Sequence, residues 1–159
     1  MRRTFVTTLA FILAVGLFGT PRASANCGAI RDSDERALCR AKERGNPAEC
    51  GSIRDSDKRA YCRAVVGKKP AECGSIRNSD LRSRCRAEVR EASSECGAIR
   101  DADERAFCRA KSKGNAAECG AIRDSDKRAY CRAIVRKNAS ECGAIRDSDL
   151  RNRCRSEAR

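Results

Sequence analysis

The sequence has no histidine and no tryptophan, only one methionine, and aromatic residues at only 4% of its 159 positions. Without histidine, the most common general base and the imidazole ligands of many zinc sites are both missing. Large apolar side chains are too scarce to fill an ordinary globular core. We therefore expect a protein without catalytic activity, cofactor or metal, and one that needs something other than an apolar core to hold it together.

The first 25 residues have the features of a secretory signal peptide. Arg2 and Arg3 precede an apolar run over residues 5–18, and Ala23-Ser24-Ala25 offers a cleavage site made of small residues. This run is shorter than the roughly 18 to 20 residues of a membrane-spanning helix. We expect residues 1–25 to be removed on export, which leaves a secreted or periplasmic domain, residues 26–159, without a membrane span. Twin-arginine export and a lipidated N-terminal cysteine are the alternatives.

Cysteine is abundant, and its spacing reveals a repeat. All twelve cysteines lie in residues 26–159, and the intervals between them alternate between 12 and 11 residues. This defines six units of 23 residues, which start at residues 27, 50, 73, 96, 119 and 142. Positions nine and twelve of the units also repeat every third unit, so the array consists of two duplicated blocks, 27–95 and 96–159. A period of this length is typical of stacked supersecondary units.

An even number of cysteines behind an export signal indicates disulfides. Pairing between consecutive units leaves Cys27 and Cys154 alone, and a nested pairing is incompatible with a three-unit ancestor. We therefore prefer pairing within each unit, where each closed loop contributes roughly 3 kcal/mol in the chain-entropy model. The competing hypothesis, metal-binding thiolates, lacks the closely spaced cysteine pairs of zinc sites. The preferred pairs are Cys27 with Cys39, Cys50 with Cys62, Cys73 with Cys85, Cys96 with Cys108, Cys119 with Cys131 and Cys142 with Cys154.

Each unit has the signals of two helices. Residues 46–49 (NPAE) are typical of a helix start, and residues 55–57 (DSD) begin a second, longer helix that we expect to end at Gly67. Asp32 and Arg36 have the spacing of a helical ion pair. Glycines at position two of each unit would permit close helix approach or serve turns. The predicted fold is all-α: a disulfide-stapled, solenoid-like array of six units, each a short helix, a turn and a longer helix.

The charge of the chain is strongly basic. The formal net charge of +13 falls to +10 when Arg2, Arg3 and Arg22 leave with the signal peptide. The densest basic clusters lie in units three and six, and arginine suits phosphate, sulfate and carboxylate groups. We name these residues as candidate anion-binding groups: Arg82, Arg84, Arg86, Arg90, Arg151, Arg153, Arg155 and Arg159.

These observations favour a non-enzymatic, exported repeat protein that acts as a structural scaffold or binding surface. The main alternative is a basic envelope or extracellular protein that binds an anionic polymer such as lipopolysaccharide, acidic polysaccharide or extracellular DNA. Another envelope or secreted protein is a further possible partner. A metal-sequestering thiol protein is the third hypothesis.

Overall fold

The computed structural model describes residues 26–159, and the predicted signal peptide, residues 1–25, lies outside the described residues. The described chain is helical, and each of its six units consists of a short 3₁₀-helix followed by an α-helix. The elements in order are η1 (Asn26–Ala29), α1 (Ser33–Arg44), η2 (Pro47–Ser52), α2 (Ser56–Gly67), η3 (Pro70–Ser75), α3 (Ser79–Arg90), η4 (Ser93–Ala98), α4 (Ala102–Lys113), η5 (Ala116–Ala121), α5 (Ser125–Arg136), η6 (Ala139–Ala144) and α6 (Ser148–Glu157). None of these helices is long and apolar enough to cross a membrane.

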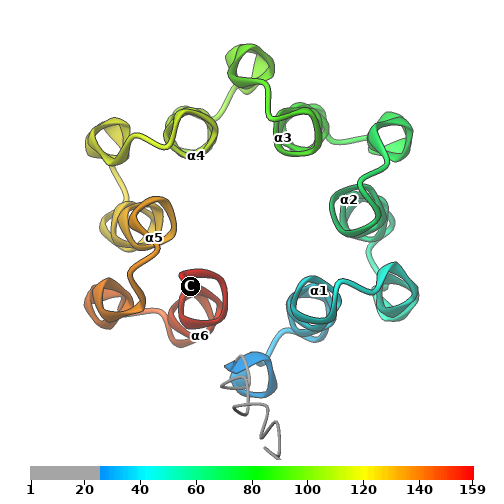
Figure 1. The fold of residues 1–159 in the computed structure, drawn as a ribbon, viewed down its shortest axis with the longest axis horizontal. Helices are drawn as coiled ribbons and strands as arrows, with labels where there is room; N and C mark the ends of the chain where they lie inside the picture. The colour runs from blue at the N-terminus through cyan, green and yellow to red at the C-terminus, as the bar shows by residue number, and fades with distance from the viewer. Residues whose placement is uncertain (1–25) are drawn as a thin grey trace, which may run out of the picture.

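The units form a closed ring, with the α-helices on the inside and the 3₁₀-helices on the outside (Figure 1). Each α-helix packs against the 3₁₀-helix of its own unit and against that of the next unit. The last helix, α6, packs in the same way against η1, the first element of the chain. The predicted array of six helical units is therefore confirmed, and its curvature closes it head to tail.

Disulfides join the two cysteines of each unit, as preferred from the sequence. Their sulfurs lie between the 3₁₀-helix and the α-helix of the unit, beside the isoleucine at position four. Each of these six isoleucines is 1% exposed, and the cysteines are at most 5% exposed. Burial of one isoleucine contributes about 1.5–3 kcal/mol, and small buried alanines such as Ala37 and Ala41 surround it and the disulfide.

The units are joined to one another by the aspartate at position eight. The carboxylate of Asp34 accepts hydrogen bonds from the backbone N–H groups of Arg54 and Asp55 in the next unit, both at 3.0 Å. The same two bonds recur at the next four junctions, where the acceptors are Asp57, Asp80, Asp103 and Asp126. At the closing junction Asp149 accepts a hydrogen bond from the backbone N–H of Arg31, at 3.1 Å.

One expectation about charged residues is wrong, and one about a helix end is confirmed. Arg36 donates to the carbonyl of Ile30 at 2.7 Å, while Asp32 caps α1 by accepting from the backbone N–H of Glu35, so they do not form the expected ion pair. The arginine at position ten makes the same bond to its isoleucine carbonyl in every unit. Helix α2 ends at Gly67, as expected from the sequence, and Lys68 caps it in the left-handed conformation.

The glycines at position two also differ from expectation. They have negative φ and nothing within 4 Å of a Cβ built on them, so neither close helix approach nor turn geometry requires glycine there. Nothing in the structure explains their recurrence. These glycines are Gly28, Gly51, Gly74, Gly97, Gly120 and Gly143.

Candidate functional site in the ring centre and on its outer wall

The centre of the ring is lined by positions nine, twelve and sixteen of each unit. Three and four residues separate these positions, which places them on one face of each α-helix. We call this set the inner face. It consists of Glu35, Leu38, Lys42, Lys58, Tyr61, Val65, Leu81, Arg84, Glu88, Glu104, Phe107, Lys111, Lys127, Tyr130, Ile134, Leu150, Arg153 and Glu157.

The middle layer of the inner face fills the centre of the ring. Leu38, Tyr61, Phe107 and Tyr130 are only 3–7% exposed. The Phe107 and Tyr130 rings pack with their centroids 5.4 Å apart. The guanidinium of Arg84 lies 5.1 Å from the centroid of the Phe107 ring and 5.8 Å from that of Tyr61. The gap that the ribbon leaves at the centre is therefore occupied by side chains.

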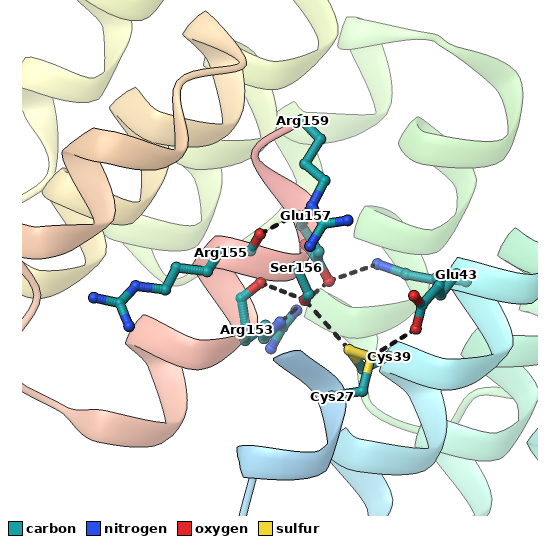
Figure 2. The surroundings of a disulfide bond; sticks show 9 residues. Cys27, Cys39, Glu43, Arg153, Arg155, Ser156, Glu157 and Arg159 are labelled. Atoms are coloured by element: carbon teal, nitrogen blue, oxygen red, sulfur yellow. Dashed lines mark hydrogen bonds and ion pairs between the residues drawn. A yellow bond between two sulfur atoms is a disulfide. The ribbon is translucent and has the colours of Figure 1, made fainter. Parts of the chain in front are cut away.

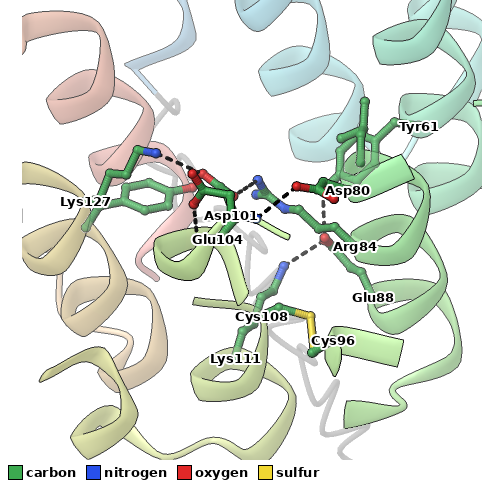
Figure 3. Close-up of polar contacts among 12 residues, drawn as sticks. Tyr61, Asp80, Arg84, Glu88, Cys96, Asp101, Glu104, Cys108, Lys111 and Lys127 are labelled. Carbon is green, nitrogen blue, oxygen red and sulfur yellow. Dashed lines mark hydrogen bonds and ion pairs between the residues drawn. A yellow bond between two sulfur atoms is a disulfide. The ribbon is translucent and has the colours of Figure 1, made fainter. Parts of the chain in front are cut away.

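Ion pairs and hydrogen bonds connect these side chains across unit boundaries (Figure 3). Arg84 of unit three pairs with Glu104 of unit four, N to O 3.0 Å. Lys111 pairs with Glu88 at 2.7 Å, and the Tyr61 hydroxyl donates to Glu88 at 2.6 Å. Glu88 therefore receives bonds from units two and four, and it holds both neighbours of its own unit.

The second block repeats this network at equivalent positions. The Tyr130 hydroxyl donates to Glu157 at 2.6 Å, and Lys42 pairs with Glu157 at 3.4 Å. Nζ of Lys42 also lies 3.9 Å from the carboxylate of Glu88. Lys42 therefore connects Glu88 of the first block with Glu157 of the second. The inner face thus has an approximate twofold arrangement that follows the duplication of the sequence.

The charges in the centre change one another's pKa values. Burial opposes ionisation of Glu88, but Lys42, Lys111 and Arg84 outweigh it and lower the pKa of Glu88 to about 2. Burial likewise opposes ionisation of Glu157, whose pKa is nevertheless lowered by Lys42 and Arg153. The pKa of Lys111 is lowered by burial, against the attraction of Glu88. Both glutamates therefore remain charged well below neutral pH, and the network stays intact.

Two cavities open at the ring centre. The first, of about 340 Å³, is lined by residues from all six units: Cys39, Lys42, Glu43, Val65, Glu88, Lys111, Ile134, Ser156, Glu157 and Arg159. The second, of about 180 Å³, is lined by Arg84, Asp103, Glu104, Phe107, Lys127, Tyr130, Leu150 and Arg153. The buried rings of Phe107 and Tyr130 form part of the wall of the second cavity. Within residues 26–159, no group of three or more cysteine, aspartate or glutamate side chains is placed to hold a metal ion.

The outer wall carries a different set of arginines. Position fourteen follows the inward position twelve by two residues, or about 200° around the helix, so it faces away from the centre. We call these residues the outer arginine belt: Arg40, Arg63, Arg86, Arg109, Arg132 and Arg155. Arg86 is half-buried and the other five are exposed. In the described part of the chain, their side chains take part in no ion pair or side-chain hydrogen bond.

The predicted anion-binding residues are divided among different parts of the ring. Arg82 and Arg151 donate to the carbonyls of Ile76 and Ile145, and Arg84 and Arg153 point into the centre. Arg90 pairs with Glu95 at 3.2 Å, and the side chain of Arg159 contacts the carbonyl of Arg155. The outer belt retains Arg86 and Arg155. Four more belt residues were visible in the sequence only as an arginine at position fourteen of every unit.

Comparison with protein-family models, with curated proteins and with solved structures found no match to this chain. The inner and outer faces therefore supply the chemistry from which its function can be inferred. Charges of the inner face are paired and connect units, whereas the outer belt, with five exposed arginines and the half-buried Arg86, has no acidic partner within residues 26–159. The interior holds the ring together, and the outer wall is available for binding.

Proposed function

We propose that the protein is an exported, non-enzymatic scaffold whose ring presents its outer wall to a binding partner. One contrast carries this proposal: the glutamates, tyrosines, lysines and arginines of the centre bind one another, while the side chains of the outer arginine belt form no ion pair or hydrogen bond within residues 26–159. All twelve sulfurs are in disulfides, which leaves no thiolate for catalysis or metal sequestration. Six disulfides also suit an oxidising compartment such as the periplasm or the extracellular space.

The belt favours an anionic polymer as the partner. The basic excess of the domain lies mostly outside the centre, because the inner face contains six basic and four acidic side chains. Arginines that are free of carboxylates can donate two parallel hydrogen bonds to a phosphate, sulfate or carboxylate group. All the aromatic side chains of residues 26–159 are buried, so no exposed ring is available to stack on nucleic-acid bases. Recognition would therefore depend on the backbone charge of the polymer and not on its sequence.

The salt dependence of binding tests this proposal. A variant with Arg63, Arg109 and Arg132 changed to glutamine removes three belt charges. Binding of a short DNA duplex, used as a probe polyanion, is measured by fluorescence anisotropy at several salt concentrations. If each belt arginine contacts one phosphate, the slope of log affinity against log salt should fall by about 2.7, or roughly 0.9 for each lost contact.

A second triple variant controls for net charge. Arg44, Arg90 and Arg136 are also exposed, but each pairs with a glutamate five residues later. Changing these three to glutamine removes the same charge and should reduce the slope much less. Equal reductions in the two variants would show that binding follows net charge and does not involve the belt.

A further inference from the structure

The junction that closes the ring repeats the junction between the two blocks. Arg153 of unit six pairs with Glu35 of unit one at 3.0 Å, just as Arg84 of unit three pairs with Glu104 of unit four at 3.0 Å. Asp149 accepts from the backbone N–H of Arg31 at 3.1 Å, which corresponds to the bond from Asp80 to Arg100 at 3.0 Å. The end faces of the chain are therefore complementary to each other in the same way as two consecutive units.

Further side-chain contacts hold the closing junction (Figure 2). The Ser156 hydroxyl, which donates to the carbonyl of Arg153, lies 3.3 Å from Sγ of Cys39. Lys42 of unit one reaches Glu157 of unit six, and the Asn152 amide donates to the carbonyl of Ala29 at 3.0 Å. These bonds bring the first and last units together although more than 100 residues separate them.

The closing junction also differs from the other five, because no peptide bond crosses it. All six disulfides lie within units, so no covalent bond of any kind links unit six to unit one. The closing aspartate accepts one backbone hydrogen bond, whereas each of the other five accepts two. Hydrogen bonds, ion pairs and packing alone keep this junction shut, and it is the place where the ring can open.

We infer that the end faces of units one and six form an assembly site for a second copy of this chain, which ring closure masks. Two different, complementary faces make a head-to-tail contact. Such contacts yield a closed ring when the rotation from one unit to the next adds up to a full turn, and an open filament when it does not. In this chain the six units complete the ring within one molecule, because α6 packs against η1. An opened chain presents unit six to unit one of another molecule, with the same bonds available.

Charge reversal at the closing junction tests this inference on the full chain. Glu35→Lys places two basic groups at the junction, and Arg153→Glu places two acidic groups there, so each variant alone should open and remain monomeric. In an equimolar mixture, unit six of each variant meets a complementary unit one of the other. Native mass spectrometry and light scattering should then detect alternating assemblies of twice the monomer mass or more.

Two controls identify the contact. The double variant E35K/R153E restores complementarity within one chain and should be a closed monomer. The matched pair Arg84→Glu and Glu104→Lys lies at the junction of units three and four, where the chain is continuous, and its mixture should remain monomeric. A monomeric mixture of E35K and R153E, or equal assembly of the matched pair, would overturn the inference.

Circular dichroism would reveal whether the single variants fail to fold. In that case a second measurement on the parent protein tests the inference. The parent protein, with its disulfides intact, is refolded from denaturant at increasing concentrations. Closure between molecules competes with closure within one molecule as concentration approaches the effective concentration of the chain ends. We expect multimers whose fraction rises with concentration and which exclude the E35K/R153E variant when the two are refolded together. Monomers alone at all concentrations, or free mixing with that variant, would contradict the inference.

Discussion

At the residue scale, the C-cap that follows the α-helix in units one to five adopts a left-handed backbone conformation. Position nineteen has positive φ in units one to five, and it is glycine only in units one and four, at Gly45 and Gly114. Lys68, Glu91 and Lys137 adopt the same left-handed conformation, with φ of 52° to 53°. The left-handed region costs a non-glycine residue roughly 1–2 kcal/mol, partly offset by the greater chain entropy that glycine loses on folding. Three of the five caps are therefore weaker than they need be.

Replacing a strained cap by glycine should stabilise the ring. We expect Glu91→Gly to raise the free energy of unfolding by about 0.5–1 kcal/mol, because glycine adopts positive φ without a Cβ clash. The change is measured by urea denaturation of the disulfide-intact protein. Gly45→Ala, at the equivalent position of unit one, should lower the stability by a similar amount. A neutral Glu91→Gly together with a neutral Gly45→Ala would show that this conformation carries no cost here.

At the element scale, the position-eight aspartates determine how one unit is placed on the next. In five of them, two backbone N–H groups of the following unit donate hydrogen bonds to the carboxylate and lower its pKa. These five are Asp34, Asp57, Asp80, Asp103 and Asp126. These N–H groups lie in the turn between the 3₁₀-helix and the α-helix. These bonds therefore fix the relative placement of three elements, and they recur at five junctions, with a single bond at the sixth.

The lowered pKa values predict a loss of stability in acid. Because the unfolded aspartate has a pKa of about 3.9, the bonds contribute fully above that pH and are lost as pH falls from about 4 through the lower pKa of the folded state. We expect the thermal midpoint of the disulfide-intact protein, followed by circular dichroism, to be lower at pH 2 than at pH 7. The double variant D57N/D126N should be less stable at pH 7 and lose less between pH 7 and pH 2. An unchanged pH dependence in that variant would contradict this origin.

At the scale of the whole molecule, disulfides and polar contacts replace a large apolar core. The apolar interior of each unit is one isoleucine with small side chains around a disulfide, and the shared centre is rich in charge. Buried ion pairs offset their desolvation only when well paired, and those of the centre are paired across unit boundaries. Disulfides therefore stabilise each unit, and hydrogen bonds and ion pairs join the units into the ring.

Complete reduction should therefore abolish the fold. After reduction under denaturing conditions, alkylation and removal of denaturant, we expect most of the helical circular dichroism signal at 222 nm to be lost, since each disulfide contributes roughly 3 kcal/mol. The control is the same treatment without reductant, in which thiol titration should find no free cysteine. Retention of the helical signal by the reduced and alkylated chain would show that packing alone suffices.

Local features of this protein could be predicted from its sequence because they depend on neighbours in the chain. The cysteine spacing determined the units, and the requirement to pair all twelve cysteines in both the array and its three-unit ancestor favoured pairing within each unit, which the structure confirms. Aspartate caps and the start of the second helix in each unit also follow from local signals, as at Asp32. The block duplication, visible at positions nine and twelve, also predicts that residue types at these positions repeat every third unit. The inner face follows this repeat.

Tertiary structure alone decided that the array closes and which side chains face its centre. The curvature of the array adds up over all six units, and no local sequence pattern indicates the total. It directed Arg84 inward to Glu104 and Arg86 to the outer wall, although the two are neighbours in one basic cluster of the sequence. It also brought Glu35 to Arg153, a contact across 118 residues that only ring closure creates. A rotation repeated over six similar units turned a linear repeat into a ring whose inner charges are paired and whose outer arginine belt is not.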